Sequence, residues 1–242
     1  MTETRKLFHE ELDDLAADVA RLGALAGEAI QAGTAAFLAE DLQATEIVIA
    51  SDRKLDELTH AIERHTYLLL ARQQPMAVDL RMLVTVLRGV HELERIGDYM
   101  VNVAKAARRL YPQPLDPRVR GLIDRMRGQA LEQLKLAVAC FVERDPAKSA
   151  ALADMDDVMD DLQKELFRYI FTTSQDSDDV SIQRSVQIAL VGRYFERIAD
   201  HAVNFGARVP YMVTGEFPEE SSGSNGASAS ATPAPDPADP EN

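Results

Sequence analysis

Apolar residues recur at three- and four-residue spacing along almost the whole chain, from residue 3 to about residue 214. The first of these stripes contains Leu12, Leu15, Val19 and Leu22. This spacing places apolar side chains on one face of an α-helix, and no convincing alternating strand pattern interrupts it. The pattern therefore predicts an all-α fold made of amphipathic helices.

Capping and stop signals divide this pattern into separate helices. Asp41 is a candidate N-cap, Pro75 ends the second helix, and Asp116 and Asp145 each precede a proline suited to a first helical position. A polar loop covers residues 173–181. These signals predict six helices, at residues 3–38, 42–72, 77–110, 117–143, 146–173 and 180–213.

The six predicted helices fall into two sets of three that share sequence. Acids in the second helix of the first set recur 104 residues later: Asp52 and Asp56 match Asp156 and Asp160. Residues 94–98 (Glu-Arg-Ile-Gly-Asp) recur 102 residues later as residues 196–200 (Glu-Arg-Ile-Ala-Asp). Core periodicity does not produce such a repeat, whereas a duplication does.

This duplication predicts two tandem three-helix bundles, over residues 3–112 and 116–214. Three long helices with short connections pack up-down-up around a shared apolar face, and two such bundles in tandem predict an elongated molecule. Residues 216–242 are rich in Ser, Pro and Ala, carry acids but no Lys or Arg, and are predicted to be disordered.

The repeated acids form pairs spaced one helical turn apart. Each pair lies on a single helix face, and the two pairs of a repeat lie on neighbouring antiparallel helices. If they face each other, they form an oxygen-rich site suited to Mg²⁺, Mn²⁺ or Ca²⁺, to iron, or to zinc with carboxylate and His ligands. The candidate metal ligands are Asp52, Asp56, Glu94, Asp98, Asp156, Asp160, Glu196 and Asp200, with Asn102 and Asn204 as further candidates.

A solvated acidic face is the competing interpretation of these pairs, since isolated acid pairs on an acidic protein are usually solvated. Arg95 and Arg197 would then simply neutralise their neighbours. Recurrence of the acids on the same two helices of both repeats favours a metal site. We expect His201, although adjacent to Asp200, to point elsewhere, because consecutive helical residues diverge by about 100°.

Charge and composition narrow the classes of function. The net charge of −14 argues against nucleic acid as the main partner. The basic stretch 105–127 is either a solvated face or a contact for an acidic partner or an anion. The single cysteine, Cys140, lies in an apolar run and is expected to be a reduced core residue. The N-terminus lacks the apolar run of a signal peptide and no membrane span is expected, so a soluble, cytoplasmic protein without direct membrane insertion is predicted.

Several segments together resemble the PhoU family of phosphate-signalling proteins. They are residues 74–81 (Gln-Pro-Met-Ala-Val-Asp-Leu-Arg), 92–98 and 195–200, and the resemblance extends over residues 3–214. It implies two three-helix bundles whose acid pairs bind metal clusters, iron or zinc in some members. It also implies a negative regulator of the phosphate-starvation response that links the ATPase subunit of a phosphate ABC transporter to a membrane sensor histidine kinase. Ala199 departs from the family's pattern, in which a glycine precedes the last acid.

The expected function is therefore that of a regulatory adaptor without catalysis, and we also expect a homodimer. Two alternatives remain open at this point. One is a metalloenzyme with a multinuclear carboxylate site, although neither a clear general base nor suitably spaced His ligands are evident. The other is a metal-free helical scaffold.

Overall fold

The computed structural model describes residues 2–73, 75–173 and 179–216 of the chain. Helices account for nearly all of these residues, and no strand occurs among them. The helices are α1 (Thr2–Ala39), α2 (Leu42–Ser51), α3 (Arg53–Gln73), α4 (Val78–Leu110), α5 (Pro117–Glu143), α6 (Pro146–Thr173), α7 (Asp179–Gly206) and α8 (Val209–Thr214). The predicted all-α fold is confirmed.

The structure divides two of the six predicted helices. The second is interrupted at Asp52, which separates α2 from α3, and the last is interrupted at residues 207–208, which separate α7 from the short α8. The helix of the second repeat that is equivalent to α2 and α3 is α6, and it is continuous. The break at Asp52 is local, because Asp56 still donates its backbone N–H to the Asp52 carbonyl oxygen at 3.3 Å.

Caps at the helix ends follow the signals in the sequence. The Asp41 side chain accepts a hydrogen bond from the Ala44 backbone N–H at 3.0 Å, and Asp116 accepts one from Arg118 at 2.8 Å. At the end of α5, Arg144 adopts a left-handed conformation with a φ of 53°, and its N–H satisfies carbonyls of the last turn. Local side-chain chemistry therefore sets most helix boundaries.

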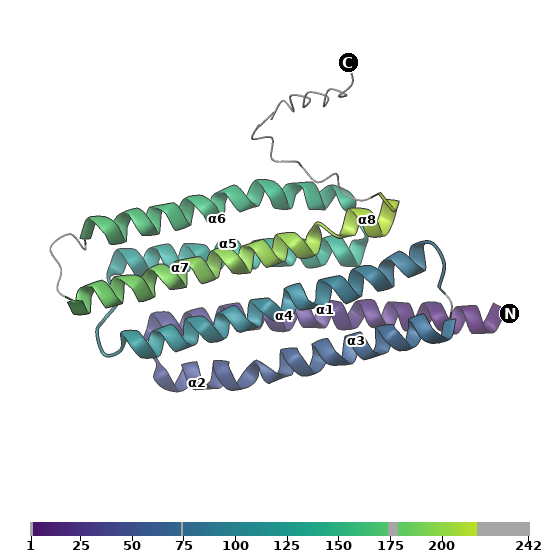
Figure 1. Ribbon diagram of the computed structural model, residues 1–242, viewed down its shortest axis with the longest axis horizontal. Helices are drawn as coiled ribbons and strands as arrows, with labels where there is room; N and C mark the ends of the chain where they lie inside the picture. The colour runs from purple at the N-terminus through teal and green to yellow at the C-terminus, as the bar shows by residue number, and fades with distance from the viewer. Residues whose placement is uncertain (1, 74, 174–178, 217–242) are drawn as a thin grey trace, which may run out of the picture.

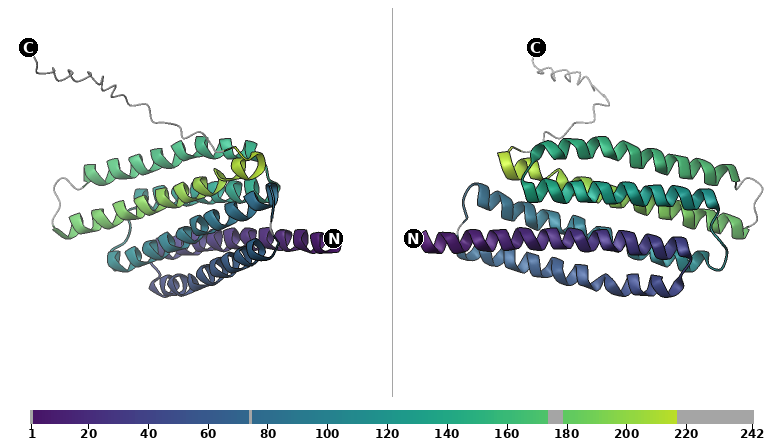
Figure 2. Two further views of the ribbon diagram at one scale, coloured as in Figure 1. Left: turned by 45° about the vertical axis from the view of Figure 1, so that its right-hand side comes forward. Right: turned by 180° about the vertical axis from the view of Figure 1, so that it is seen from behind.

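The two three-helix units pack side by side rather than end to end. In Figures 1 and 2 the helices run roughly parallel in a stack, with α6 on one outer side and α2 and α3 on the other. Between them lie α1, α4, α5 and α7, and the most extensive packing of any helix pair is that of α4 against α7. The two tandem units therefore share an interface that runs along their helices, in which α4 packs against α7 and α1 against α5.

One hydrophobic core runs through both repeats. Fully buried residues from both halves belong to the same cluster, including Leu93 and Ile96 of α4 and Phe195 and Ile198 of α7. Close approach between the halves is helped by Gly89, where an added Cβ would lie 2.9 Å from the Phe205 ring. The shared core indicates that the two repeats form one structural unit.

Helix α1 supplies the central apolar strip of the first repeat. Its residues 5–39 are long and apolar enough to cross a membrane by length and composition alone. Leu15, Val19, Leu22 and Ile30 are nevertheless completely buried in the protein core. The apolar character of this helix is therefore accounted for by packing within the fold.

Cys140 and the basic stretch have structural roles within the fold. Cys140 is fully buried, as predicted, and burial raises the pKa of its thiol to about 11. In the basic stretch, Arg108 pairs with Glu46 at 2.9 Å and Arg120 with Glu40 at 3.4 Å. Most of the predicted disordered tail, residues 217–242, lies outside the described residues.

Candidate functional site

In the first repeat, the four predicted acids lie together on one side of the α2–α3–α4 unit. Asp52 ends α2, Asp56 lies one turn later on α3, and Glu94 and Asp98 lie one turn apart on α4. Burial raises the pKa of Asp52 to about 6, with further contributions from the charges of Asp56, Asp98 and Glu94 in that order. Mutual repulsion of this kind requires the carboxylates to be close together.

Gly97 lets the Asp52 side chain lie against the backbone of α4. A Cβ added at Gly97 would lie only 2.7 Å from Asp52 Oδ1 and 3.2 Å from a methyl carbon of Leu55. Any larger residue at this position would push the Asp52 carboxylate away from Glu94 and Asp98. The glycine in the Glu-Arg-Ile-Gly-Asp segment therefore has a definite role in assembling the acidic cluster.

The second repeat places its matching acids between α6 and α7. Burial raises the pKa of Asp156, helped by the nearby charges of Asp200 and Asp160. Burial and the Asp200 charge likewise raise the pKa of Glu196. The equivalent of Gly97 is Ala199, which is fully buried and carries a methyl group where the first repeat has none. The two clusters are therefore equivalent in composition but not in packing.

Arginines on the same helices neutralise part of each cluster. Arg95 donates to Asp98 at 3.0 Å, and Arg197 donates to Asp200 at 2.7 Å. Arg193 pairs with Glu196, which is 9% exposed and whose second oxygen, Oε2, is buried without a hydrogen-bond partner. An unpartnered buried carboxylate oxygen is costly unless a cation or a proton satisfies it.

The donor set of both clusters fits a hard cation, although the side chains are not closed around one. Among the described residues, no three or more His, Cys, Asp or Glu side chains converge as a ready-made metal site. Carboxylates at raised pKa, together with the unpartnered Glu196 oxygen, provide the ligands that such ions prefer. Rotation of the arginines out of their ion pairs would free the remaining oxygens for coordination.

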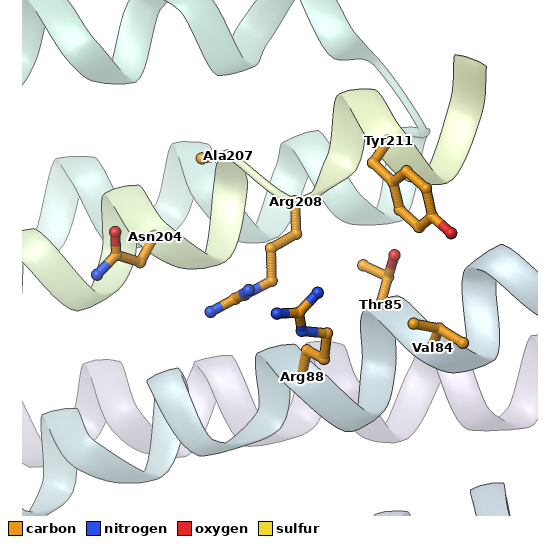
Figure 3. Close-up of a pocket in the computed structure, with 7 residues that line it drawn as sticks. All are labelled: Val84, Thr85, Arg88, Asn204, Ala207, Arg208 and Tyr211. Atoms are coloured by element: carbon orange, nitrogen blue, oxygen red, sulfur yellow. The ribbon is translucent and has the colours of Figure 1, made fainter. Parts of the chain in front are cut away.

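The two asparagines occupy different surroundings from the acids. Asn204 lines a pocket between α4 and the α7–α8 junction, together with Arg88 and Arg208 (Figure 3). Asn102 lies one turn beyond Asp98 on α4 and is partly buried. Their assignment as additional metal ligands stays a prediction.

His201 points away from the acidic cluster, as the sequence indicated. Its Nδ1 lies 2.8 Å from Glu92 Oε2, and Glu92 also accepts a hydrogen bond from Arg208. Burial alone would raise the pKa of Glu92, but the hydrogen bonds from His201 and Arg208 outweigh it and lower that pKa. This partly buried triad joins α4 to α7 and so ties the two repeats together.

An aromatic contact lies between the two clusters. Tyr99, next to Asp98, packs against Tyr194 and His201 with ring centroids 6.0 and 5.5 Å apart. Its hydroxyl oxygen lies 3.5 Å from Nε of Arg197, the arginine that holds Asp200. A short chain of contacts thus connects the acids of one repeat to those of the other.

Comparison with known proteins agrees with this duplicated architecture. The PhoU domain matches the chain twice, at residues 19–107 and 123–209. The chain belongs to the PhoU family.

Relatives of this PhoU-family chain match it over nearly their whole length. A Mycobacterium tuberculosis (strain ATCC 25618 / H37Rv) protein named phosphate-specific transport system accessory protein PhoU homolog 1 is 36% identical over 217 residues, covering 89% of this chain and 97% of its own. A Synechocystis homologue of the same name, without a number, is 33% identical over 212 residues, covering 88% and 93% respectively.

Solved structures show the same fold. The crystal structure of PhoU from Pseudomonas aeruginosa superimposes with a TM-score of 0.80 at 28% identity, covering 86% of this chain and all of that one. The phosphate transport system regulatory protein PhoU from Streptococcus pneumoniae also gives 0.80 at 28% identity, with 88% and 99% covered. The tandem three-helix bundles predicted for a PhoU-like chain are therefore confirmed.

Two contacts in this structure involve residues to which no role was assigned from the sequence. Arg81, the last residue of the 74–81 segment, donates to the carbonyl oxygens of Met212 at 3.2 Å and Val213 at 3.1 Å. It thereby holds the end of α8, from the second repeat, against α4. His91 lies 2.9 Å from Glu63 and 3.8 Å from Glu94, which connects α3 to the first acidic cluster. The sequence showed the segment that contains Arg81, but it gave no sign that Arg81 contacts Met212, 131 residues away.

Proposed function

We propose that this chain is a cytoplasmic regulatory adaptor of phosphate uptake that restrains the phosphate-starvation response. The observation that carries the proposal is the nearly full-length similarity to relatives named as accessory proteins of a phosphate-specific transport system. A relative that matches from end to end, with both repeats, shares the whole architecture rather than one module. A role in the same kind of system is the simplest account of that similarity.

In this proposal the chain links the ATPase subunit of a phosphate ABC transporter to a membrane sensor histidine kinase. The parallel helices offer long exposed faces on opposite sides of the stack (Figure 2), which suits an adaptor with two partners. A homodimer is part of the same proposal. No catalytic step is assigned, because an adaptor acts through its contacts alone.

The acidic clusters are proposed to hold metal ions, either iron, zinc, or Mg²⁺ or Mn²⁺. Asp52, Asp56, Glu94 and Asp98 would hold the ion in the first repeat; the second set would be Asp156, Asp160, Glu196 and Asp200. A bound cation would supply positive charge that removes the repulsion among these carboxylates. It would thereby fix α2 and α3 against α4, and α6 against α7, in one arrangement that a partner can recognise.

A deletion strain of the source organism provides the central test. We expect loss of the gene to activate phosphate-starvation genes in phosphate-rich medium, and a copy of the gene to restore repression. A reporter of starvation-gene expression and uptake of radiolabelled phosphate measure the two effects. Normal repression and uptake in the deletion strain would refute the adaptor role.

Variants separate the metal from the adaptor role. Asp98→Asn with Asp200→Asn removes one acid from each cluster, while Asp14→Asn with Glu132→Gln changes two exposed acids elsewhere by the same charge. We expect only the first pair to lose metal in elemental analysis and to weaken pull-down of the ATPase subunit and the kinase. If metal is lost but partner binding and repression are unchanged, the metal has no part in the mechanism and a metal-free scaffold is the better description.

A further inference from the structure

A second polar site lies between the repeats, apart from both acidic clusters. It is a pocket of about 250 Å³ where α4 faces the α7–α8 junction (Figure 3). None of the eight clustered acids lines it. Its polar lining consists of Thr85 and Arg88 from α4 and Asn204, Arg208 and Tyr211 from the second repeat.

Two arginines enter this pocket from opposite walls. In Figure 3 the side chain of Arg88 rises from α4 and that of Arg208 descends from the α7–α8 junction, and both guanidinium groups lie in the space between these elements. Arg88 makes no hydrogen bond or ion pair with any described residue. Arg208 pairs with Glu92, yet its Nε is buried without a partner. Glu92 therefore balances the charge of Arg208, whereas Arg88, which is exposed, has no counter-ion among the described residues.

Thr85 adds a buried hydroxyl without a partner. Its side chain is only 2% exposed, and Oγ1 has no hydrogen-bond partner among the described residues. Of the other buried threonines, Thr34 and Thr66 each donate to the carbonyl four residues earlier at 2.7 Å, whereas Thr59, which does not line this pocket, also lacks a partner among the described residues. In Figure 3 the Thr85 hydroxyl lies on the pocket side of α4, toward Arg208 and Tyr211. Buried polar groups without partners are rare and suggest a missing ligand.

The duplication provides an internal comparison for this pocket. At the offset of 102 residues that relates α4 to α7, the equivalents of Arg88 and Arg208 are Leu190 and Ala106. Two basic residues, Lys105 and Arg109, lie close to Ala106 in the sequence. Arg109 donates a hydrogen bond to Gln187 at 3.3 Å. The fold itself therefore does not require facing arginines at this place, and their presence on one side points to a ligand.

We propose that this pocket binds one small tetrahedral oxyanion of the phosphate type. Arg88 and Arg208 would donate charge-assisted hydrogen bonds, and the Thr85 hydroxyl and the Asn204 amide would donate neutral ones. The volume is below the roughly 300–1,000 Å³ of pockets for larger organic ligands, which favours a single oxyanion with a few waters over a nucleotide. Because the walls come from both repeats, the bound anion would hold α4 and α7 together.

The test measures anion binding to the full chain after removal of metal with a chelator, so that phosphate cannot bind through a metal ion. Inorganic phosphate, sulfate and ADP are titrated separately at constant ionic strength, with calorimetry and thermal unfolding as readouts. We expect about one phosphate per chain and a melting temperature that rises with phosphate. Arg88→Gln is expected to weaken binding at least tenfold, and Thr85→Val to weaken it by a smaller factor. Arg109→Gln, the matched control near the position that the duplication relates to this pocket, should bind like the unaltered chain.

Thermal unfolding without added anions separates a loss of anion binding from a loss of folding stability. Arg88 has no partner to lose and faces another cation, so the Arg88→Gln chain should melt at or above the temperature of the unaltered chain, while gaining nothing from phosphate. ADP binding that is tighter than phosphate binding, and is lost in Arg88→Gln, would identify a nucleotide's phosphoryl group as the source of the oxyanion. Absence of saturable anion binding, or binding that Arg88→Gln leaves unchanged, overturns the proposal. The result is independent of the adaptor role, because it is measured on the isolated chain.

Discussion

The two acidic clusters have the same four carboxylates but different surroundings. In the first repeat the helix is interrupted at Asp52, and Gly97 lets that carboxylate lie against α4. In the second repeat α6 is continuous, and a buried alanine, Ala199, stands at the equivalent position. Duplication thus preserved the chemistry while the packing diverged. At the position where Asp52 approaches α4, the two repeats differ by one methyl group.

The largest expected difference concerns the residue before the last acid of each cluster. Gly97→Ala places a Cβ 2.7 Å from Asp52 Oδ1, so we expect metal affinity at the first cluster to fall roughly 10- to 100-fold, as when a group that positions a ligand is lost. Alanine favours helix over glycine, so folding should not suffer. Titration of the chelated protein with Mn²⁺ or Zn²⁺ measures the change.

Ala199→Gly is the matched control for that substitution. It removes a methyl group from the second cluster, where no aspartate rests on the backbone, and should change affinity there by less than about threefold. Equal losses in both variants would show that the two clusters do not differ in the way the packing indicates.

The pH dependence of stability should reveal the repulsion within both clusters in metal-free protein. Burial and nearby carboxylates raise the pKa of Asp52 to about 6 in the folded state, against 3.8 ordinarily. Between about pH 4 and 6 the folded chain therefore binds more protons than the unfolded chain, so stability falls as pH rises through this window and the penalty is complete above it.

Asp52→Asn should therefore stabilise the metal-free protein at pH 7.5, by on the order of 1 kcal/mol after allowance for partial exposure, and make no difference below about pH 4. Urea unfolding at several pH values measures this effect. Asp156→Asn, whose aspartate pKa is also raised by burial and by Asp200, should act in the same direction. A variant that gains the same stability at all pH values would contradict the electrostatic explanation.

The N-caps should behave alike in the two repeats, in contrast to the acids. Asp41 accepts from the Ala44 N–H at 3.0 Å, and Asp145 accepts from the Ala147 N–H at 2.9 Å. Replacing either with alanine should lower the free energy of unfolding by about 1 kcal/mol. Chemical denaturation compares the two, and a strong difference would mean that the repeats diverged at their helix ends as well.

The smallest expected effects concern the arginines that pair with the last acids. Arg95 is exposed, and its one ion pair within the described part of the chain is with Asp98, so Arg95→Gln should change stability by less than about 0.5 kcal/mol. Arg197 also lies 3.5 Å from the Tyr99 hydroxyl, so Arg197→Gln should cost somewhat more, up to about 1 kcal/mol. A double-mutant cycle with Tyr99→Phe isolates that contact, and a coupling energy of zero would remove it from the link between the repeats.

Much of the fold could be predicted because its signals are local. Three- and four-residue apolar spacing, Asp41, and the Asp-Pro pairs at residues 116 and 145 act within a few residues of where they stand. Recurrence of the acids at constant offsets also revealed the duplication without any structure. The break at Asp52 was missed because the apolar pattern continues through it.

Part of the candidate site followed from the same local rules. Asp52 and Asp56, like Glu94 and Asp98, share a helix face by spacing alone, and an antiparallel neighbour brings the two faces together. The sequence showed Gly97 only as part of the repeated segment, and its close contact with the Asp52 carboxylate appeared only in the structure. That contact depends on the rotation of α2 and α3 about their axes, which periodicity leaves undetermined.

What the sequence determined by itself was therefore the helical class, most helix ends, the two repeats and the rows of acids. Only the tertiary structure decided that the repeats lie side by side, that Arg81 holds α8, and that Arg88 meets Arg208 across a pocket. Hydrophobic burial is non-directional, so an apolar face specifies that it must be covered but not by which other face. Which faces pack together is decided by shape complementarity between α4 and α7. Their contacting residues lie about a hundred positions apart in the sequence.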